Sequence, residues 1–325
     1  SSYQIPAAFN TQAKAILRDL LAAQGDRQGA AALNRELGLV STFAILGSFD
    51  NDGRRGHAAT YPPEQEERAA TAEKTYEGRH ARLPLSYRTV PPEALARDGS
   101  LHIESWVSPD TQGTVYAVCY VKSPTAQRVA VRLGGSGAVK VWVNRGAPVI
   151  SSEAYHPLSP EQHVAGAELL AGWNRLLVKL SAVERPFALT LRLSAPDGSP
   201  LPGPPLVTSA TPPSPDWPLP KAVPYVGPPP AQLERALRDR LARVPAKDAA
   251  ARAQALFELG SYLHFLQPGD VEKHEDATLL GESMALRPSR QTAYLLAAAS
   301  TDHNDKRRAL EEGLALPAGA KDRDA

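Results

Sequence analysis

A cluster of prolines constrains this chain more than any other feature: thirteen of its 30 prolines lie between Pro200 and Pro230. Proline lacks a backbone N–H and has a fixed φ, so such a run can neither continue a helix nor join the middle of a sheet. The composition predicts an extended, semi-rigid segment over residues 196–230 that separates two structured regions. Trp217 and Tyr225 are candidates for holding this segment on a neighbouring domain, and recognition of its prolines by another protein is the alternative.

Before the prolines, over residues 39–195, apolar residues recur with a period of two. The clearest run is Thr114–Val121, in which both alternating sets are largely apolar, and similar runs include Val129–Leu133 and Val139–Val143. Glycine, proline, asparagine or aspartate separates these runs. Many short alternating segments between turns are typical of an antiparallel sandwich or barrel rather than a parallel sheet.

Both ends of the chain show helical spacing. Residues 1–38 predict two short helices with a break at Gly25-Asp26. After the prolines, residues 231–325 carry amphipathic stripes, and Gly313–Pro317 echoes Ser283–Pro288. Helical hairpins that end in proline at this period are typical of tetratricopeptide-like units. About two such units are fewer than a solenoid needs, which predicts a packing partner or further repeats.

Charge and composition exclude some classes of function. The chain of 325 residues carries 36 basic and 35 acidic residues, a net charge of +1, so we expect no nucleic-acid partner. No stretch approaches the roughly 20 apolar residues that span a bilayer, so we expect no transmembrane segment. The single cysteine, Cys119, lies in an apolar run and is interpreted as a small buried side chain.

Several segments together carry a resemblance to a known family. They are Phe43–Asn51, Tyr61–Glu64, Val115–Ala117, Val129–Gly134, Val139–Asn144 and Ala171–Lys179. In this order they resemble the bacterial jelly-roll modules of the galactose-binding and protective-antigen type, over roughly half of the chain. Such modules occur in exported bacterial proteins, often beside tetratricopeptide repeats. The resemblance implies a multidomain α+β fold, a jelly-roll β-sandwich plus helical hairpins, and a periplasmic, cell-surface or secreted location. A chain trimmed of its leader would begin as this one does, with Ser1-Ser2-Tyr3, and so would an internal fragment.

One departure from that family concerns its sugar site. The resemblance implies paired aspartates before the strand Val139–Val143, where they hold calcium that in turn holds sugar hydroxyls. Here the turn is Gly134-Gly135-Ser136-Gly137-Ala138, which offers no carboxylate for a cation that needs several hard oxygen ligands. We therefore expect the calcium-dependent sugar site of the family to be missing.

Two groups of residues are candidates for binding. Asp50 and Asp52, with Asn51 and Gly53, have the chemistry of a structural calcium site, although ordinary turn and capping roles are favoured. Trp106, with His102 and Glu104 at alternating positions, is the best candidate for an exposed sugar-stacking platform. Trp142 and Trp173 lie in strands and are expected in the core.

A catalytic site is not predicted. The eight histidines are scattered, without the spacing of a zinc site. Gly135-Ser136-Gly137 lacks the full pattern of a nucleophile elbow. Glu64, Glu66 and Glu67 are interpreted as a solvated charge run rather than an acid/base pair. No cofactor is expected apart from the possible calcium, and the chain is predicted not to be an enzyme.

Three functions remain open. The first is a protein-interaction scaffold of the bacterial envelope, with partners bound by the helical tail, the sandwich or both. The second is a carbohydrate-binding module for extracellular or cell-wall polysaccharide. The third is the non-catalytic N-terminal part of a larger enzyme, such as one with a transglutaminase-like domain.

Overall fold

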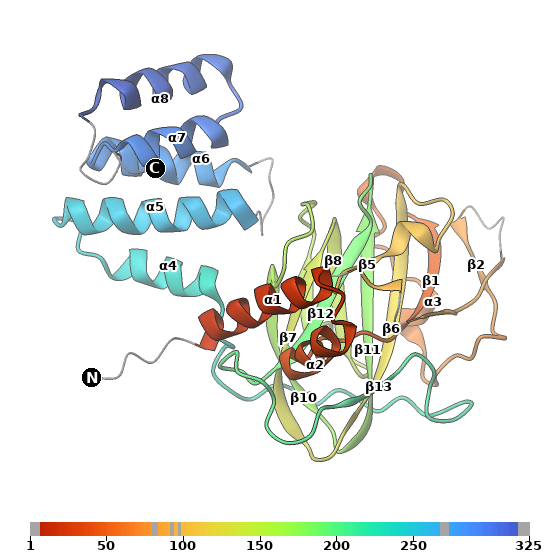
Figure 1. The fold of residues 1–325 in the computed structure, drawn as a ribbon. Coiled ribbons are helices and arrows are strands. Elements are labelled where there is room, and N and C mark those ends of the chain that lie inside the picture. The colour runs from red at the N-terminus through yellow and green to blue at the C-terminus, as the bar shows by residue number, and fades with distance from the viewer. Residues whose placement is uncertain (1–6, 80–83, 92–93, 97–98, 267–272, 318–325) are drawn as a thin grey trace. The chain divides into compact units, whose positions relative to one another are not determined.

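The computed structural model describes residues 7–79, 84–91, 94–96, 99–266 and 273–317. Contacts between residues divide the chain into two compact units, Ser1–Pro230 and Ala231–Ala325, and each unit is described by itself. Figure 1 shows sheets together with helices in the first unit and helices alone in the second.

Two helices open the first unit, α1 (Ala7–Ala23) and α2 (Arg27–Leu37). The carboxylate of Asp26 accepts a hydrogen bond from the backbone N–H of Gly29 at 2.9 Å and so caps the start of α2. Gly38 ends α2 in the left-handed conformation, with φ of 74°. The break expected at Gly25-Asp26 therefore arises from a cap.

Two antiparallel sheets form the body of this unit. The larger has the strand order β4 (Arg88–Val90), β1 (Phe43–Asp50), β6 (Gly113–Ser123), β11 (Gly172–Ala182), β8 (Ala138–Val143) and β9 (Ile150–Ser152), and β13 (Val207–Ser209) also pairs with β6. The smaller has the order β10 (His163–Leu169), β7 (Gln127–Gly135), β12 (Ala188–Ser194) and β5 (Leu101–His102). A separate short hairpin joins β2 (Tyr76–Glu77) and β3 (Pro84–Leu85).

One apolar core lies between the two sheets. It takes Val115 and Cys119 from β6 and Val178 from β11, and it takes Val131 and Leu191 from the smaller sheet. Burial raises the pKa of the Cys119 thiol to about 12, so this cysteine is an inert core side chain, as the sequence predicted. The expected antiparallel β-structure followed by helices is confirmed.

The outer face of the larger sheet is covered as well. Tyr116, Tyr120 and Trp142 point away from the inner core and pack in a second buried cluster, together with Tyr76 and Tyr87 from the segment that follows α3 (Pro62–Gln65). A strand with an apolar core on each side needs apolar residues at every position, and this explains why both faces of Thr114–Val121 are apolar.

The proline-rich segment lies against the first unit. Trp217 accepts a backbone hydrogen bond from Ala69 at 2.8 Å, and its ring meets the ring of Tyr120 edge-on at 5.9 Å. A Cβ atom placed on Gly166 of β10 would lie 2.4 Å from the Tyr225 ring. Trp217 and Tyr225 thus hold the segment on the sheets, so over this stretch it is packed rather than a spacer.

The second unit consists of α4 (Leu233–Arg243), α5 (Ala249–Leu266), α6 (Glu275–Leu286), α7 (Arg290–Ala299) and α8 (His303–Ala315). Pro288 lies between α6 and α7, and the side chain of Ser289 caps α7 by accepting from the backbone N–H of Thr292 at 3.0 Å. Leu280, Leu295 and Ala299 form its buried apolar cluster. Among the described residues no helix is both long and apolar enough to cross a membrane.

Candidate functional site

A pocket of about 310 Å³ opens in the first unit, at one end of its two sheets. Four connections line it: the residues after β1, the β7–β8 turn, the β9–β10 loop and the β11–β12 turn. They contribute Arg54, Ser136, Gly137, Tyr155, His156, Pro157, Ala182, Val183, Glu184, Arg185 and Pro186. The turn Gly134–Ala138, in which the sequence shows no carboxylate, therefore faces a pocket, and Glu184 supplies a carboxylate from the neighbouring turn.

Tyr155 and Arg54 form one wall of this pocket. The guanidinium carbon of Arg54 lies 4.8 Å from the centre of the Tyr155 ring, a cation–π contact. The Tyr155 hydroxyl donates to Oδ1 of Asn51 at 3.2 Å, and burial raises its pKa. Tyr155 is thus a neutral, fixed aromatic surface.

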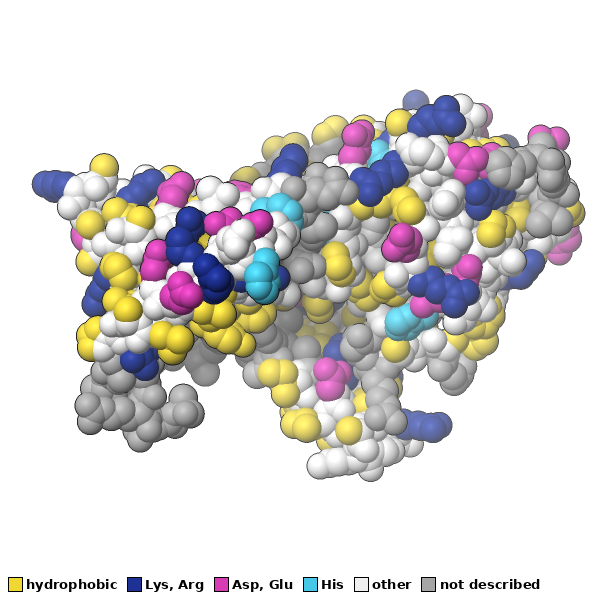
Figure 2. All heavy atoms as spheres, turned by 90° about the horizontal axis from the view of Figure 1, so that it is seen from above, with side chains coloured by type: hydrophobic (Ala, Val, Ile, Leu, Met, Phe, Trp, Pro, Cys, Tyr) yellow, Lys and Arg dark blue, Asp and Glu magenta, His cyan; other side chains and the backbone are white. Residues whose placement is uncertain are grey.

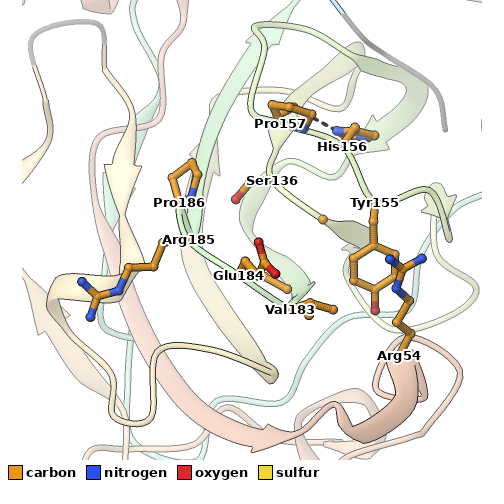
Figure 3. A pocket seen from close by; sticks show the side chains of 11 residues that line it. Arg54, Ser136, Tyr155, His156, Pro157, Val183, Glu184, Arg185 and Pro186 are labelled. Carbon is orange, nitrogen blue, oxygen red and sulfur yellow. Dashed lines mark hydrogen bonds between the residues drawn. The ribbon is translucent and has the colours of Figure 1, made fainter. Parts of the chain in front are cut away.

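Figure 3 shows the side chains of Ser136 and Glu184 across the pocket from Tyr155, while Arg185 points away from it. Arg185 is ion-paired with Asp110. The Ser136 hydroxyl accepts a hydrogen bond from the backbone N–H of Ala188 at 2.8 Å, so it is held by the fold and is not poised as a nucleophile. Glu184 is exposed, so its carboxylate is a hydrogen-bond acceptor that the pocket presents to solvent.

His156 and His163 meet beside the pocket. Their Nε2 atoms lie 3.0 Å apart, and Nδ1 of His156 lies 3.1 Å from the carbonyl oxygen of Pro157. Burial, and then the charge of His156, lowers the pKa of His163 to about 4. The His163 ring is therefore neutral near pH 7, and a hydrogen bond joins the two Nε2 atoms. Within the described part of the chain, no group of three or more His, Cys, Asp or Glu side chains is placed to hold a metal ion.

The structure pairs two of the three residues expected to form a sugar platform. Nδ1 of His102 lies 3.1 Å from Oε1 of Glu104, and Oε2 of Glu104 accepts from the backbone N–H of Phe187 at 3.2 Å. Trp106, at the end of the short 3₁₀ helix Ile103–Ser105, is half-buried and packs against the inner core. The hydrogen bond to Phe187 ties Glu104 to the residue before β12. The Trp106 ring is only partly exposed.

Asp50 and Asp52, the candidate calcium ligands, both face Arg79. Nη2 of Arg79 donates to Oδ1 of Asp52 at 2.9 Å, and its Nε lies 3.7 Å from Oδ1 of Asp50. Asn51 between them accepts from the backbone N–H of Gly56 at 3.0 Å, as expected of a turn-forming side chain. A calcium ion would have to compete with this guanidinium for the two carboxylates.

The glutamates interpreted as a solvated run are mostly buried, so that prediction is wrong for two of them. The side chains of Glu64 and Glu66 are 10% and 5% exposed, and only Glu67, at 83%, is solvated. Glu64 lies 2.8 Å from Nζ of Lys179, and Glu66 lies 3.5 Å from Nη1 of Arg175. Each carboxylate of the segment at α3 thus neutralises one cation that β11 directs to the outer face of the larger sheet.

Sequence reasoning missed Arg175 and Lys179 because both lie in an otherwise apolar strand. They stand four residues apart in Trp173–Leu180, a spacing that places both on one face of a β-strand. Glu64 and Glu66 are two residues apart in the sequence. Two acidic residues at this spacing, together with two cations on one face of a strand, could have indicated the two buried ion pairs. The pocket was missed because four connections distant in sequence build it.

Exposed apolar side chains are concentrated on the helices. Large apolar residues that are at least 41% exposed lie on α1, α4, α5, α6, α7 and α8 and in the proline-rich segment; they are Ile16, Leu17, Leu20, Leu233, Phe265, Leu286, Tyr294, Leu310, Leu314, Val207, Val223 and Val226. Among the described residues, strands β1 to β12 contribute none. Figure 2 shows hydrophobic side chains of the helical unit interspersed with charged ones.

Comparison with known proteins adds little to this description. No family model matches the chain, and no curated protein matches it. One solved structure that is similar to part of the chain is the GH31 alpha-xylosidase from Xanthomonas citri, with 13% sequence identity and a TM-score of 0.25. That match covers 52% of this chain and spans 18% of the xylosidase.

Proposed function

We propose that this chain is a non-catalytic protein-interaction protein of the bacterial envelope, which binds protein partners through its helices. The observation that carries the proposal is the distribution of exposed apolar side chains, which lie on the helices and the proline-rich segment but not on strands β1 to β12. Contact surfaces of proteins carry exposed apolar side chains, and here these lie on helices of both units and on the proline-rich segment. The envelope location rests on the resemblance to exported jelly-roll modules.

A photo-crosslinking experiment tests this proposal. Benzoylphenylalanine at Tyr294 or Phe265, which are 68% and 67% exposed, is expected to capture one and the same protein in native cells. The matched control carries it at Lys122, an exposed position on β6. Capture of unrelated proteins at the two helical positions, or equal capture of the same protein at Lys122, contradicts the proposal.

The tetratricopeptide character of the second unit is part of this proposal. Ser283 of α6 donates to the carbonyl of Ala253 in α5 at 2.8 Å, and Gly313 of α8 lies against Ala293 of α7. Gly313 follows Ser283 by 30 residues, and each lies against the preceding helix, Ser283 on α5 and Gly313 on α7. This correspondence supports two copies of one helical hairpin.

A saccharide ligand in the end pocket is the second candidate, favoured by the aromatic ring of Tyr155 opposite the carboxylate of Glu184. A ring that stacks on a sugar face, beside an acceptor for its hydroxyls, is a common way to hold a saccharide. A glycan array, run with calcium and again with chelator, is expected to show saturable binding that Tyr155→Ala and Glu184→Gln abolish and His102→Ala leaves intact. Binding that only His102→Ala removes would transfer the site to His102 and Glu104.

A further inference from the structure

The loop of residues 153–162, between β9 and β10, forms one wall of the end pocket. Tyr155, His156 and Pro157 of this loop line the pocket (Figure 3). The loop is tied to the β7–β8 turn, where the backbone N–H of Gly137 donates to the carbonyl of His156 at 2.9 Å. The contacts that hold His156 therefore also hold this wall in place.

Gln162, which is buried, determines where His156 carries its proton. Its Oε1 accepts from the backbone N–H of Gly135 at 3.1 Å, so the other end of the amide is the NH2 group. That group donates to the carbonyl of Pro157 at 2.6 Å and to Nδ1 of His156 at 2.9 Å. An Nδ1 atom that accepts a hydrogen bond has no proton, so the neutral His156 ring carries its proton on Nε2.

The rings of His156 and His163 meet end to end. Their Nε2 atoms lie 3.0 Å apart and their ring centres 5.1 Å apart, so the gap between the rings holds one proton. His156 donates this proton to the unprotonated Nε2 of His163. Because His163 begins β10, which pairs with β7 along its whole length, this bond ties the loop to the smaller sheet.

A further proton has no favourable place in this arrangement. On Nε2 of His163 it puts two N–H groups into the gap between the rings. If His156 instead carries its own proton on Nδ1, facing the carbonyl of Pro157 at 3.1 Å, that proton meets the NH2 group of Gln162. In either case two donors face each other where a hydrogen bond held the loop.

The carboxylates around the pair are directed to other groups. Glu161, which precedes Gln162, is bound by Arg132 of β7 at 2.9 Å and by Arg192 of β12 at 2.6 Å. Glu184 lies apart from His156 in the pocket (Figure 3).

His57 is a second buried imidazole that faces the loop. Its Nδ1 lies 3.5 Å from Oε1 of Glu153. A proton on His57 would attract Glu153 and hold the loop more firmly, so it opposes the effect of a proton on the His156–His163 pair. The two sites are therefore separable by the sign of their effect.

We propose that His156 and His163 form an acid-sensitive latch, which holds the β9–β10 loop and its Tyr155 on the pocket and releases them when the pair takes up a proton. The latch stands on the hydrogen bonds of Gln162, His156 and His163. Its control over a saccharide rests on the second function proposed above, because Tyr155 is the ring on which such a ligand would stack.

Hydrogen exchange of the full chain tests the latch without a ligand. The pKa of His163 is about 4 with the loop in place and about 6.5 for a free ring, so opening of the loop is expected to be about 20-fold more frequent at pH 5 than at pH 7. Protection factors over residues 153–162, corrected for the intrinsic effect of pH on exchange, should fall by that factor. Those of β6 and β11 should stay unchanged, because pH 5 lies above the ordinary range of carboxylates.

His163→Gln is the matched variant, because its amide oxygen can accept from Nε2 of His156 and does not titrate. It is expected to keep the loop protected at pH 7 and to remove most of the fall at pH 5. His57→Gln is the control, in which the fall should persist. Equal protection of the native loop at both pH values, or a full fall in His163→Gln, overturns the proposal.

Ring ¹⁵N spectra of the native chain give a check that needs no folded variant. At pH 7 one of the two rings should be protonated at Nε2 and its partner at Nδ1. Protons on Nε2 of both rings would contradict the proposed latch.

The glycan array, run at pH 7 and at pH 5, separates the latch from the saccharide function. Binding that weakens at pH 5 in the native chain but not in His163→Gln supports control of the pocket by the latch. If the loop is released at pH 5 and no glycan binds at pH 7, the saccharide function falls and the latch stands. Equal glycan binding at both pH values, with the loop released at pH 5, overturns the control of a saccharide by Tyr155.

Discussion

Lys179 is a fully buried cation in the middle of a strand. Its ammonium donates to Glu64 at 2.8 Å and to the carbonyl of His57 at 3.2 Å, and it lies 5.2 Å from the centre of the Tyr61 ring. Burial lowers its pKa, while the carboxylate of Glu64 opposes that shift. This ion pair fixes the position of the α3 segment on the sheet. Burying either charge without the other lowers the free energy of unfolding.

Removing one charge of this pair is therefore expected to be worse than removing both. Glu64→Gln leaves Lys179 buried without its carboxylate and is expected to lower the free energy of unfolding by about 3–5 kcal/mol. The double variant Glu64→Gln, Lys179→Met is expected to lose less, because no unpaired charge remains. Urea unfolding of both variants measures this, and a double variant less stable than Glu64→Gln would contradict it.

The His156–His163 pair makes stability depend on pH. The pKa of His163 is lowered to about 4 in the folded chain and is about 6.5 when unfolded, so the unfolded state binds more protons between these values. The contribution of His163 to the free energy of unfolding is thus fully present above pH 6.5. It is lost as the pH drops towards 4, which lowers the free energy of unfolding by about 3 kcal/mol. Urea titrations across this range should show the slope, and His163→Gln should reduce it, while His57, whose pKa burial also lowers, contributes the remainder. An unchanged slope in that variant would show that groups other than His163 cause the pH dependence of stability.

At the scale of elements, the covering segments decide what the sheets expose. The β2–β3 hairpin with its flanking residues and the proline-rich segment bury tyrosines and a tryptophan on the outer face of the larger sheet. The proline-rich segment also reaches β10 of the smaller sheet, where the Tyr225 ring occupies the space that a side chain at Gly166 would need. An extended chain without its own core is held by such local contacts.

A side chain at Gly166 should therefore release the end of the proline-rich segment. Gly166→Val is expected to increase amide exchange and protease cleavage over residues 221–230, while exchange in β6 and β11 stays slow. Tyr225→Ala should have the same effect. Tyr225→Phe, which keeps the ring but loses the hydrogen bond of its hydroxyl to Pro228, is the control. Protection of residues 221–230 in Gly166→Val would refute this account of the contact.

At the scale of the molecule, two units have separate apolar cores. In the first unit apolar residues of both sheets and of the covering segments are buried on the two sides of the larger sheet, whereas the second has a small cluster around Leu280. A helical unit with so few fully buried large side chains is expected to be the less stable one.

We expect two thermal transitions, with the helical unit melting first. Circular dichroism at 222 nm should report the earlier transition and tryptophan fluorescence the later one, because all four tryptophans lie in the first unit. A chain that ends at Pro230 should keep the later transition at the same temperature. A single transition seen by both probes, or a shifted one in the shortened chain, would show that the units unfold together.

Much of the fold follows from sequence periodicity. Alternation over Thr114–Val121 and the break at Gly25-Asp26 predict elements that the structure contains, because strand and helix periods and capping residues act locally. The pocket at Tyr155 and Glu184 could not be predicted in this way, since four connections far apart in sequence build it. The burial of Glu64 and Glu66 was equally hidden, because a run of charges is solvated unless partners from another strand face it.

The sequence by itself determined the antiparallel strands, the helical ends, the inert cysteine and the proline-rich stretch, because each depends on neighbours along the chain. Only the tertiary structure decided that Lys179 meets Glu64, that the proline-rich stretch lies on the sheets, and that Leu310 and Leu314 are exposed while Leu280 and Met284 are covered. Leu280 packs against Gly260 of α5 and shares a buried cluster with Leu295 of α7. Burial is a property of the neighbours in space, which one helix cannot encode.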